Sequence, residues 1–290
     1  MGKQEESQTN FTFFGPTSGV DPILLLETEN EQTLAFAERL KWIRNNKVPC
    51  FFISPHLDDA IYSAGSLISF LTQETDVNIL TLFTKANHQA FSEAAKRWLK
   101  ASGHEDAEEH YRLRNIEDEK ASAEVGASSV HLGFVGTIWR RENITTPMLG
   151  YNPLITPEDE ELITQAQETI QLLIPSDKPF IIFGPIAVGG HIDHILTREI
   201  VGRSFNNIIR WVDFPYSQNS VLDKDNLKVN GLSEAEWRGN SDRKVKGILG
   251  YESQNKANFQ NGVITLTVEH YYFDQLQNPS SSLIQYVKPR

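Results

Sequence analysis

Two short segments of the chain carry histidine and aspartate side chains at spacings that suit a metal ion. In the first segment, His56, Asp58 and Asp59 follow the apolar residues 51–53. Histidine nitrogen and carboxylate oxygen are ligands of divalent transition metals, and a carboxylate that is not used as a ligand can serve as a base. An apolar strand that ends in these residues, just before a helix, therefore predicts a reactive site.

The second segment lies far downstream and has the same character. His191, Asp193 and His194 follow the apolar run 180–184 and the glycine pair 189–190. Open α/β folds bind their ligands outside the carboxyl ends of the strands, so two strand-to-helix junctions can meet at one edge of a sheet. We expect the two segments to form one site.

Within each segment the candidate ligands are three residues apart, which places them on one side of a helical turn. A hydrolytic zinc ion usually has three protein ligands and an open position, whereas a closed set of four ligands would be structural. The spacing alone leaves both arrangements open. Asp58 and Asp193 are unnecessary in a structural site, however, and they therefore favour catalysis.

The predicted elements that position these segments alternate between strand and helix. Strands are predicted at 48–53, 77–83, 130–134, 179–183 and 208–214, and helices at 29–45, 59–72, 91–99, 105–126, 157–173 and 191–205. This alternation is typical of a Rossmann-like α/β fold, in which helices cover both faces of a mostly parallel sheet. Residues 136–156 suit a loop over a pocket. In the less regular C-terminal third we expect a helix at 233–250 and an edge strand at 263–273.

The composition limits the classes of protein to consider. The 290 residues, of which 39% are hydrophobic, can fill a core, and we expect a loosely ordered arm over 1–20 and a single α/β domain over 21–290. A net charge of -11 argues against non-specific nucleic-acid binding, which needs a basic surface. Cys50 is the only cysteine, so the sequence offers neither an intrachain disulfide nor a cysteine-based zinc site.

No targeting or membrane signal stands out in the sequence. The N-terminus lacks the apolar core of a signal peptide, and no later apolar run approaches the ~20 residues that span a bilayer. We therefore expect a cytoplasmic protein without membrane insertion. The sequence leaves homo-oligomerisation open.

The two segments resemble the motifs of the PIG-L/LmbE-like zinc deacetylases, which remove acetyl or other acyl groups from amino sugars such as N-acetylglucosamine. Residues 55–60, Pro-His-Leu-Asp-Asp-Ala, are similar to the first motif of the family, Pro-His-Pro-Asp-Asp-Glu. Residues 191–194, His-Ile-Asp-His, match the second motif, His-x-Asp-His. The resemblance covers about residues 48–256 and implies a Rossmann-like fold with the metal site at the carboxyl ends of the strands.

Further similarities lie between and beyond the two motifs. Arg114 and Glu117 stand at the spacing of an Arg-x-x-Glu helix of the family, and residues 132–134 match the end of the strand that follows it. Residues 251–254 resemble the end of a C-terminal helix with a Ser-Gln pair. Residues 213–216 are similar to the Asp-x-Pro-Tyr segment of the subgroup whose first motif reads Ser-Pro-His-Leu-Asp-Asp-Ala.

The resemblance implies a metal site in which His56, Asp59 and His194 hold zinc. Three ligands leave a position free for water, as a hydrolytic site requires. A set of histidine and carboxylate ligands also accepts iron or cobalt, so another divalent transition metal stays open.

The resemblance also implies which groups act in catalysis. Asp58 would be the general base toward the water that the metal activates. His191, as a cationic imidazole, would stabilise the oxyanion or protonate the leaving amine, and Asp193 would orient His191. Hydrolysis of an amide needs these contributions together.

The substrate contacts of this chain differ from the family pattern. Ala60 replaces the glutamate that follows the aspartate pair, and Gly136 replaces an aspartate that often contacts a sugar hydroxyl. The candidates for contacts with the substrate are Arg114, Arg140, Tyr216 and Tyr251.

Taken together, these residues predict a zinc-dependent hydrolase that removes an N-acyl group, N-acetyl in the simplest case, from an amino sugar or glycoconjugate. One alternative is a metallohydrolase of a non-sugar amide or an ester, which Ala60 and Gly136 leave open. The other alternative is a metal-stabilised binding protein without turnover. The presence of Asp58, His191 and Asp193 argues against it.

Overall fold

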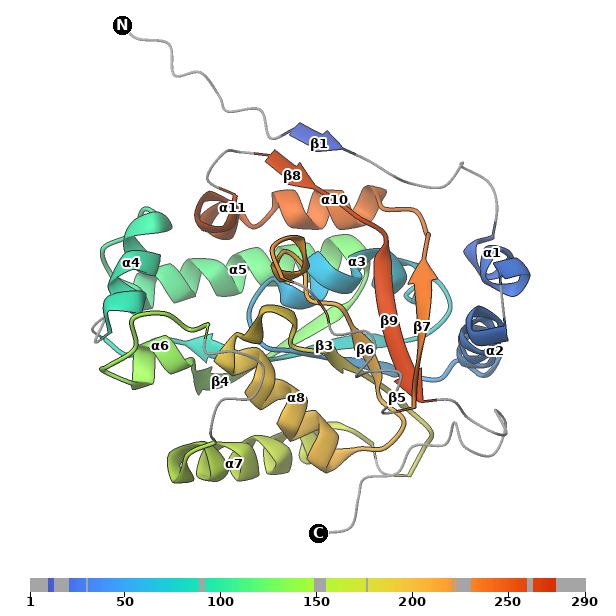
Figure 1. Ribbon diagram of the computed structural model, residues 1–290, viewed down its shortest axis with the longest axis horizontal. Coiled ribbons are helices and arrows are strands. Elements are labelled where there is room, and N and C mark those ends of the chain that lie inside the picture. Colours follow the sequence, from blue (N-terminus) through green and yellow to red (C-terminus); the bar gives the residue numbers. More distant parts are fainter. Residues whose placement is uncertain are drawn as a thin grey trace, which may run out of the picture.

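The computed structural model describes residues 10–12, 21–29, 31–88, 92–148, 155–175, 177–220, 222, 231–259 and 263–274. In this part of the chain a seven-stranded sheet forms the centre of the molecule, with the strand order β4-β3-β2-β5-β6-β9-β7. Helices cover both faces of the sheet (Figure 1). This architecture confirms the predicted Rossmann-like α/β fold class.

The strands of the main sheet are β2 (Cys50–Ser54), β3 (Val77–Lys85), β4 (Ser128–Val135), β5 (Ile181–Pro185), β6 (Ile209–Trp211), β7 (Leu232–Trp237) and β9 (Glu269–Asp274). The strands β4, β3, β2, β5 and β6 pair in parallel, β9 pairs antiparallel with β6, and β7 pairs antiparallel with β9. The sheet is therefore mostly parallel, as predicted. Its central strands are β2 and β5, which are also the strands that lead into the two histidine and aspartate segments.

The helices form two layers and a group at one end of the sheet (Figure 1). The first layer contains α1 (Pro22–Glu29), α2 (Glu31–Asn46), α3 (Asp59–Leu71), α5 (Ala107–Val125) and α10 (Asp242–Leu249), and the second layer contains α7 (Pro157–Leu173) and α8 (Ile192–Ser204). The group at the end contains α4 (Glu93–Ala101), α6 (Thr137–Arg140) and α11 (Glu252–Asn258). The last three helices contribute to the cavity described below.

The strand β2 shows how the sequence produces the two-layered core. Its five residues are all buried, with Cys50 and Phe52 in the core under the first helix layer and Phe51 and Ile53 in the core under the second. Because successive side chains of a strand point to opposite faces, a strand that is covered on both faces needs an uninterrupted apolar run. This burial fixes β2 in the centre of the sheet, so its carboxyl end delivers the following residues to the site.

The predicted helix over 233–250 was wrong in its first part, which forms β7. The buried side chains of β7 are Ser233, Ala235 and Trp237, and the residues between them are partly exposed. This alternation is the pattern of a strand, but alanine and glutamate are strong helix formers and make the local sequence resemble a helix. Pairing with β9 therefore overrides the local preference.

The predicted edge strand over 263–273 was also wrong in its placement. The segment forms β8 (Val263–Thr265) and, separately, β9, which lies between β6 and β7 inside the main sheet. The helix α1 was not predicted, and it packs on α2 through Ile23 and Leu26. The other strands and helices predicted up to residue 214 are present with shifted ends.

Of the expected N-terminal arm, the structure describes β1 (Asn10–Thr12), which pairs in parallel with β8. Residues 1–9 and 13–20 lie outside the described residues, as do residues 149–154 of the expected loop. Among the residues that are described, no helix is long and apolar enough to cross a membrane. The assignment of residues 21–290 to one domain stays a prediction.

Candidate metal and catalytic site

The structure brings the two histidine and aspartate segments together at the carboxyl ends of β2 and β5. His56 follows β2, whereas His191 and His194 stand at the start of α8, which follows β5. The ring centroid of His56 lies 4.9 Å from that of His191 and 5.3 Å from that of His194. Two parallel strands at the centre of the sheet thus deliver both segments to one place.

Three side chains form a compact set of candidate metal ligands. The Oδ2 atom of Asp59 lies 3.0 Å from Nδ1 of His56 and 3.2 Å from Nε2 of His194. One ligand atom from each residue lies within 4.8 Å of the others, a span that a single ion can bridge. A second group with the same property contains His56, His191 and Asp193.

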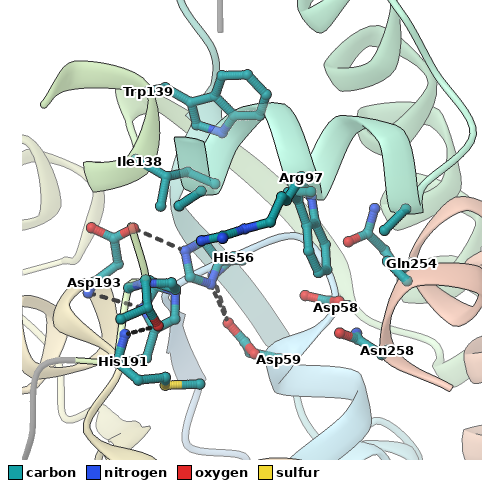
Figure 2. Close-up of a pocket in the computed structure, with 18 of the residues that line it drawn as sticks. His56, Asp58, Asp59, Arg97, Ile138, Trp139, His191, Asp193, Gln254 and Asn258 are labelled. Atoms are coloured by element: carbon teal, nitrogen blue, oxygen red, sulfur yellow. Dashed lines mark hydrogen bonds and ion pairs between the residues drawn. The ribbon is translucent and has the colours of Figure 1, made fainter. Parts of the chain in front are cut away.

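Each of the two histidines in the first set is also paired with a carboxylate on its other ring nitrogen. His56 lies between Asp59 and Asp193, and its Nε2 is 3.2 Å from Oδ2 of Asp193 (Figure 2). Nδ1 of His194 is 2.6 Å from Oδ1 of Asp213, which is buried and accepts a second hydrogen bond from the backbone N–H of Val188. Carboxylates in this position fix the orientation of a metal-binding imidazole.

The electrostatics of the site fit a cation. Four buried carboxylates surround the histidines, namely Asp58, Asp59, Asp193 and Asp213. Among the described residues, the arginines paired with them are Arg114, which is buried, and Arg140, which is partly buried, so negative charge exceeds positive charge when the imidazoles are neutral. Within the described part of the chain, Nε2 of His194 is buried and makes no hydrogen bond, although it faces Asp59. A divalent ion would satisfy this nitrogen and offset the excess charge.

Asp58 is buried beside this ligand set and is free to act as a base. It is the N-cap residue of α3, but its side chain makes no capping hydrogen bond and instead lines the cavity. Burial and the neighbouring Asp59 raise the pKa of Asp58 to about 7, against the opposing effect of Arg114, whose guanidinium lies 3.8 Å away. A carboxylate with a pKa near neutrality is well matched to proton transfer at physiological pH.

The backbone fixes which ring nitrogen of His191 is free to donate a hydrogen bond. Its Nδ1 accepts a hydrogen bond from the backbone N–H of Asp193 over 3.1 Å, so the proton of the ring must reside on Nε2. Burial and the neighbouring His56 hold the pKa of His191 well below its ordinary value. The N–H at Nε2 is therefore the free donor of this ring at the start of α8, and the catalytic role of His191 stays a prediction.

Among the described residues the carboxylate of Asp193 makes no hydrogen bond to His191, although one of its oxygens lies within 4.8 Å of a His191 ring nitrogen, so its predicted role in orienting His191 stays a prediction. The carboxylate accepts hydrogen bonds from the backbone N–H and the hydroxyl of Thr137, and it lies beside His56. The contact between Asp193 and His191 runs through the backbone N–H of Asp193 instead. The carboxylate thus orients His56, and the backbone orients His191.

A cavity of about 380 Å³ opens above these residues. Its floor, as we define it, consists of His56, Asp58, Asp59, His191 and Asp193. Its wall, as we define it, consists of the lining residues that α4, α6 and α11 contribute, and these include Arg97, Trp98, Ile138, Trp139, Gln254 and Asn258. Figure 2 shows this part of the cavity. The floor is polar and charged, whereas much of the wall is aromatic and aliphatic.

The four predicted substrate contacts divide into two groups. Arg114 and Tyr216 line the cavity, so a contact with the substrate stays a prediction for them. Arg140 and Tyr251 are not among the described residues that line it. Arg140 binds Thr137 and Asp159, and Tyr251 is fully buried with its hydroxyl donated to Asp118. Both residues brace the structure around the site in these contacts, and a contact with the substrate stays a prediction for them as well.

The two departures from the family pattern have different surroundings. Ala60 is buried in the main apolar core, where a glutamate side chain would be enclosed by hydrophobic groups. Gly136 lines the cavity, and a Cβ atom at this position would lie 3.2 Å from Oδ2 of Asp193. The absence of a side chain at Gly136 therefore leaves the Asp193 carboxylate free to accept the hydrogen bonds from Thr137.

The site contains functional candidates that the sequence reasoning did not assign. Asp213 supports His194, and its only sequence signal was its place in the 213–216 segment. Thr137 binds the Asp193 carboxylate, and no motif indicated it. Gln254 lines the cavity wall, and its only sequence signal was its place in the Ser-Gln pair.

The fold and the ligand set together define an α/β protein with a candidate metal-dependent active site. Residues 51–205, which are just over half of the chain, match the family model described as "PIG-L: GlcNAc-PI de-N-acetylase". The chain belongs to the PIG-L family, which confirms the predicted family.

Individual relatives are consistent with this assignment. The chain is 26% identical over 216 residues to a 2'-N-acetylparomamine deacetylase of Streptomyces fradiae, covering 70% of this chain and 72% of the relative. It is similar in fold to the A40926 pseudoaglycone deacetylase Dbv21, with a TM-score of 0.59, 22% identity, and coverage of 78% and 97% of the two chains. The zinc-inhibited form of the teicoplanin deacetylase Orf2 gives a TM-score of 0.61, 21% identity, and coverage of 80% and 100%.

Proposed function

We propose that this protein hydrolyses the N-acetyl group of an amino sugar or amino-sugar conjugate, with a divalent metal ion held by His56, Asp59 and His194. Zinc is the ion we expect from the ligand types. The observation that carries this proposal is the Asp58 carboxylate, which lies buried beside the ligand set, makes no capping hydrogen bond to α3 and lines the cavity. A structural metal site would have no use for such a group.

A divalent ion in this ligand set would polarise the carbonyl of the scissile amide and lower the pKa of a water molecule. Asp58 accepts the proton of the attacking water, because its carboxylate is buried beside the ligand set and lines the cavity. The same carboxyl group can then pass the proton to the nitrogen of the leaving amine. Arg114, 3.8 Å from Asp58, stabilises the carboxylate form that accepts the proton of the water and limits the rise of the pKa of Asp58.

His191 contributes a hydrogen bond to the reacting carbonyl group. Because the backbone N–H of Asp193 occupies Nδ1, the N–H at Nε2 is the free donor. A neutral imidazole at the start of a helix can donate to the oxygen on which negative charge develops without carrying a charge itself. The hydrogen bond strengthens as the oxyanion forms, so it lowers the barrier rather than tightening binding of the substrate.

The names of the relatives support an N-acetylated sugar conjugate as the substrate class. The relative from Streptomyces fradiae is named for an N-acetylated paromamine, and the similar structures are named for the antibiotics A40926 and teicoplanin. These names agree in deacetylation and differ in the group attached to the reacting amide. We therefore propose the reaction and the sugar class, and no particular conjugate.

The test is a substrate panel with zinc-reconstituted protein, in which free amine and acetate are both measured. We expect release from N-acetylglucosamine glycosides and much slower release from simple N-acetyl amines and acetate esters. Faster turnover of the simple amides or esters would favour the alternative of a non-sugar metallohydrolase. Tight zinc and a bound glycoside with no acetate released would indicate a binding protein and overturn the proposal.

A further inference from the structure

The wall of the cavity contains a buried acceptor that the proposed mechanism does not use. Gln254 lies on α11, is fully buried and lines the cavity (Figure 2). Its Oε1 has no hydrogen-bond partner among the residues that the structure describes. A buried carbonyl oxygen without a donor is costly, so such an atom in a cavity is expected to have a function.

The neighbouring residues fix the orientation of this amide. Ser253 donates its hydroxyl proton to Oε2 of Glu117 over 2.6 Å, and its backbone N–H donates to Oε1 of the same carboxylate over 3.0 Å. Because the hydroxyl proton is used, the Ser253 oxygen can only accept a further hydrogen bond. It accepts from Nε2 of Gln254 over 2.9 Å. The side-chain amide of Gln254 therefore cannot flip to exchange its nitrogen and oxygen, and Oε1 is the atom left without a donor.

The position of Gln254 relates this acceptor to the reaction. Figure 2 shows Gln254 and Asn258 on the side of the cavity where Asp58 lies. They are four residues apart on α11 and thus lie on the same side of the helix, and both line the cavity. A molecule whose amide is held over the floor would also touch this part of the wall.

We propose that Gln254 is a specificity-determining residue that accepts a hydrogen bond from a hydroxyl group of the sugar whose N-acetyl group is cleaved. This inference rests on the proposed function and deepens it. Gly136, where a sugar contact was expected from a carboxylate, has no side chain, whereas Gln254 offers an oriented acceptor. Its neutral amide selects a neutral hydroxyl donor and, unlike a carboxylate, adds no charge that would attract an ammonium group. The orientation is held by Glu117 through Ser253.

The experiment compares the wild type with Gln254→Met, which removes the acceptor and keeps a similar size. The substrates are the methyl glycoside of N-acetylglucosamine and its 3-deoxy, 4-deoxy and 6-deoxy analogues, with zinc-loaded full-length protein. We expect the wild type to lose about ten-fold in kcat/KM on one deoxy analogue, because the acceptor is then left buried without a donor. Gln254→Met should lose about as much on the parent glycoside and no longer distinguish it from that analogue.

A matched control separates recognition from support of the helix. Asn255 also lies on α11 but accepts a hydrogen bond from Tyr62 and does not appear among the described residues of the cavity lining. We expect Asn255→Ala to lower the melting temperature and to leave the preference among the four glycosides unchanged. The inference is overturned if the preference survives in Gln254→Met, or if the wild type shows no preference.

The failure of the inference is distinguishable from failure of the proposed function. If no glycoside releases acetate with zinc-loaded wild type, the proposed reaction is wrong. Binding of the same four glycosides is then measured by calorimetry for the wild type and Gln254→Met. A preference that disappears in the variant supports the role of Gln254, and equal binding of all four glycosides to both proteins overturns it.

Discussion

The floor and the wall of the cavity arise from the sequence in different ways. The floor comes from two contiguous segments, 56–59 and 191–193, each at the end of a central parallel strand. The wall comes from three short helices that lie far apart in the chain, α4, α6 and α11. The floor is thus a local consequence of where strands end, whereas the wall exists only after distant helices have packed together.

From this difference we expect the floor to determine the rate of the reaction and the wall to determine the choice of substrate. Under the proposed function, a floor residue would act on the amide group, which every substrate contains, so a change there should affect all substrates alike. A wall residue would contact the part of the substrate that varies, so its effect should depend on the substrate. The following predictions test this division, and a floor variant with substrate-dependent effects would break it.

The largest expected effect is that of Asp58→Asn. The variant keeps the shape of the side chain but cannot accept the proton of water, so kcat should fall by ~10²–10⁴-fold for every substrate while zinc stays bound. The measurement is acetate release together with the zinc content of the protein. The matched control is Asp106→Asn, which changes the N-cap of α5 outside the cavity and should keep full activity.

A smaller effect is expected behind the floor, at Asp213→Asn. The amide would weaken the support of Nδ1 of His194, so zinc affinity should fall by about 10–100-fold, as is usual when such a partner is lost. Competition with a chelator measures this affinity without reference to turnover. The exposed Asp177→Asn serves as the control, and an unchanged zinc affinity in Asp213→Asn would show that His194 needs no carboxylate partner.

Trp139 of the wall belongs to a small apolar cluster that also contains Leu57 and Tyr111, and we expect the packing of this cluster to lose stability in acid. His110 is buried next to this cluster, and neither ring nitrogen has a hydrogen-bond partner among the described residues. Burial, together with Arg114 and His104, lowers the pKa of His110 to about 3. The unfolded chain binds a proton near pH 6.5 and the folded protein does not, so stability is lost as the pH falls below 6.5.

At pH 5 this contribution amounts to about 2 kcal/mol relative to neutral pH. Replacement by His110→Phe should therefore reduce the loss of unfolding free energy between pH 7 and pH 5 by about that amount. Urea denaturation at the two pH values, with zinc held constant, measures the difference. Identical pH dependence in both proteins would mean that His110 is not the group responsible.

The smallest expected effect is that of Trp98→Ala in the wall. The side chain is partly buried and lines the cavity, so its loss should raise KM by about 10-fold for conjugates with an apolar group and leave kcat nearly unchanged. Steady-state kinetics on two glycosides, one with an aromatic aglycone and one with a methyl group, test this. Trp42→Ala, on α2 away from the cavity, is the control and should change neither parameter.

The sequence was sufficient to predict the floor because its geometry is local. A strand that is buried on both faces needs an apolar run, and the run 51–53 stops where His56 begins the polar segment. The spacing of three residues then places both candidate ligands of each segment close to the start of a helix. The hydrogen bonds of the Asp193 carboxylate could not be predicted, because they come from Thr137, which lies in another part of the chain.

The wall could not be predicted, because it depends on packing between distant segments. The orientation of Gln254 is set by Glu117, 137 residues earlier in the chain, through Ser253. No local sequence pattern around Glu117 or Ser253 indicates that contact. The hydrogen bond from the Tyr251 hydroxyl to Asp118 is a second contact between distant segments that no local pattern indicates.

The most direct test of the floor as a metal-dependent hydrolytic site is acetate release from an N-acetylglucosamine glycoside by metal-free protein, before and after zinc is added. We expect no release before the addition, full release once zinc binds, and neither zinc binding nor release in His194→Ala. Full activity of the metal-free protein, or no activity of the zinc-loaded protein on any N-acetylated sugar, would contradict it.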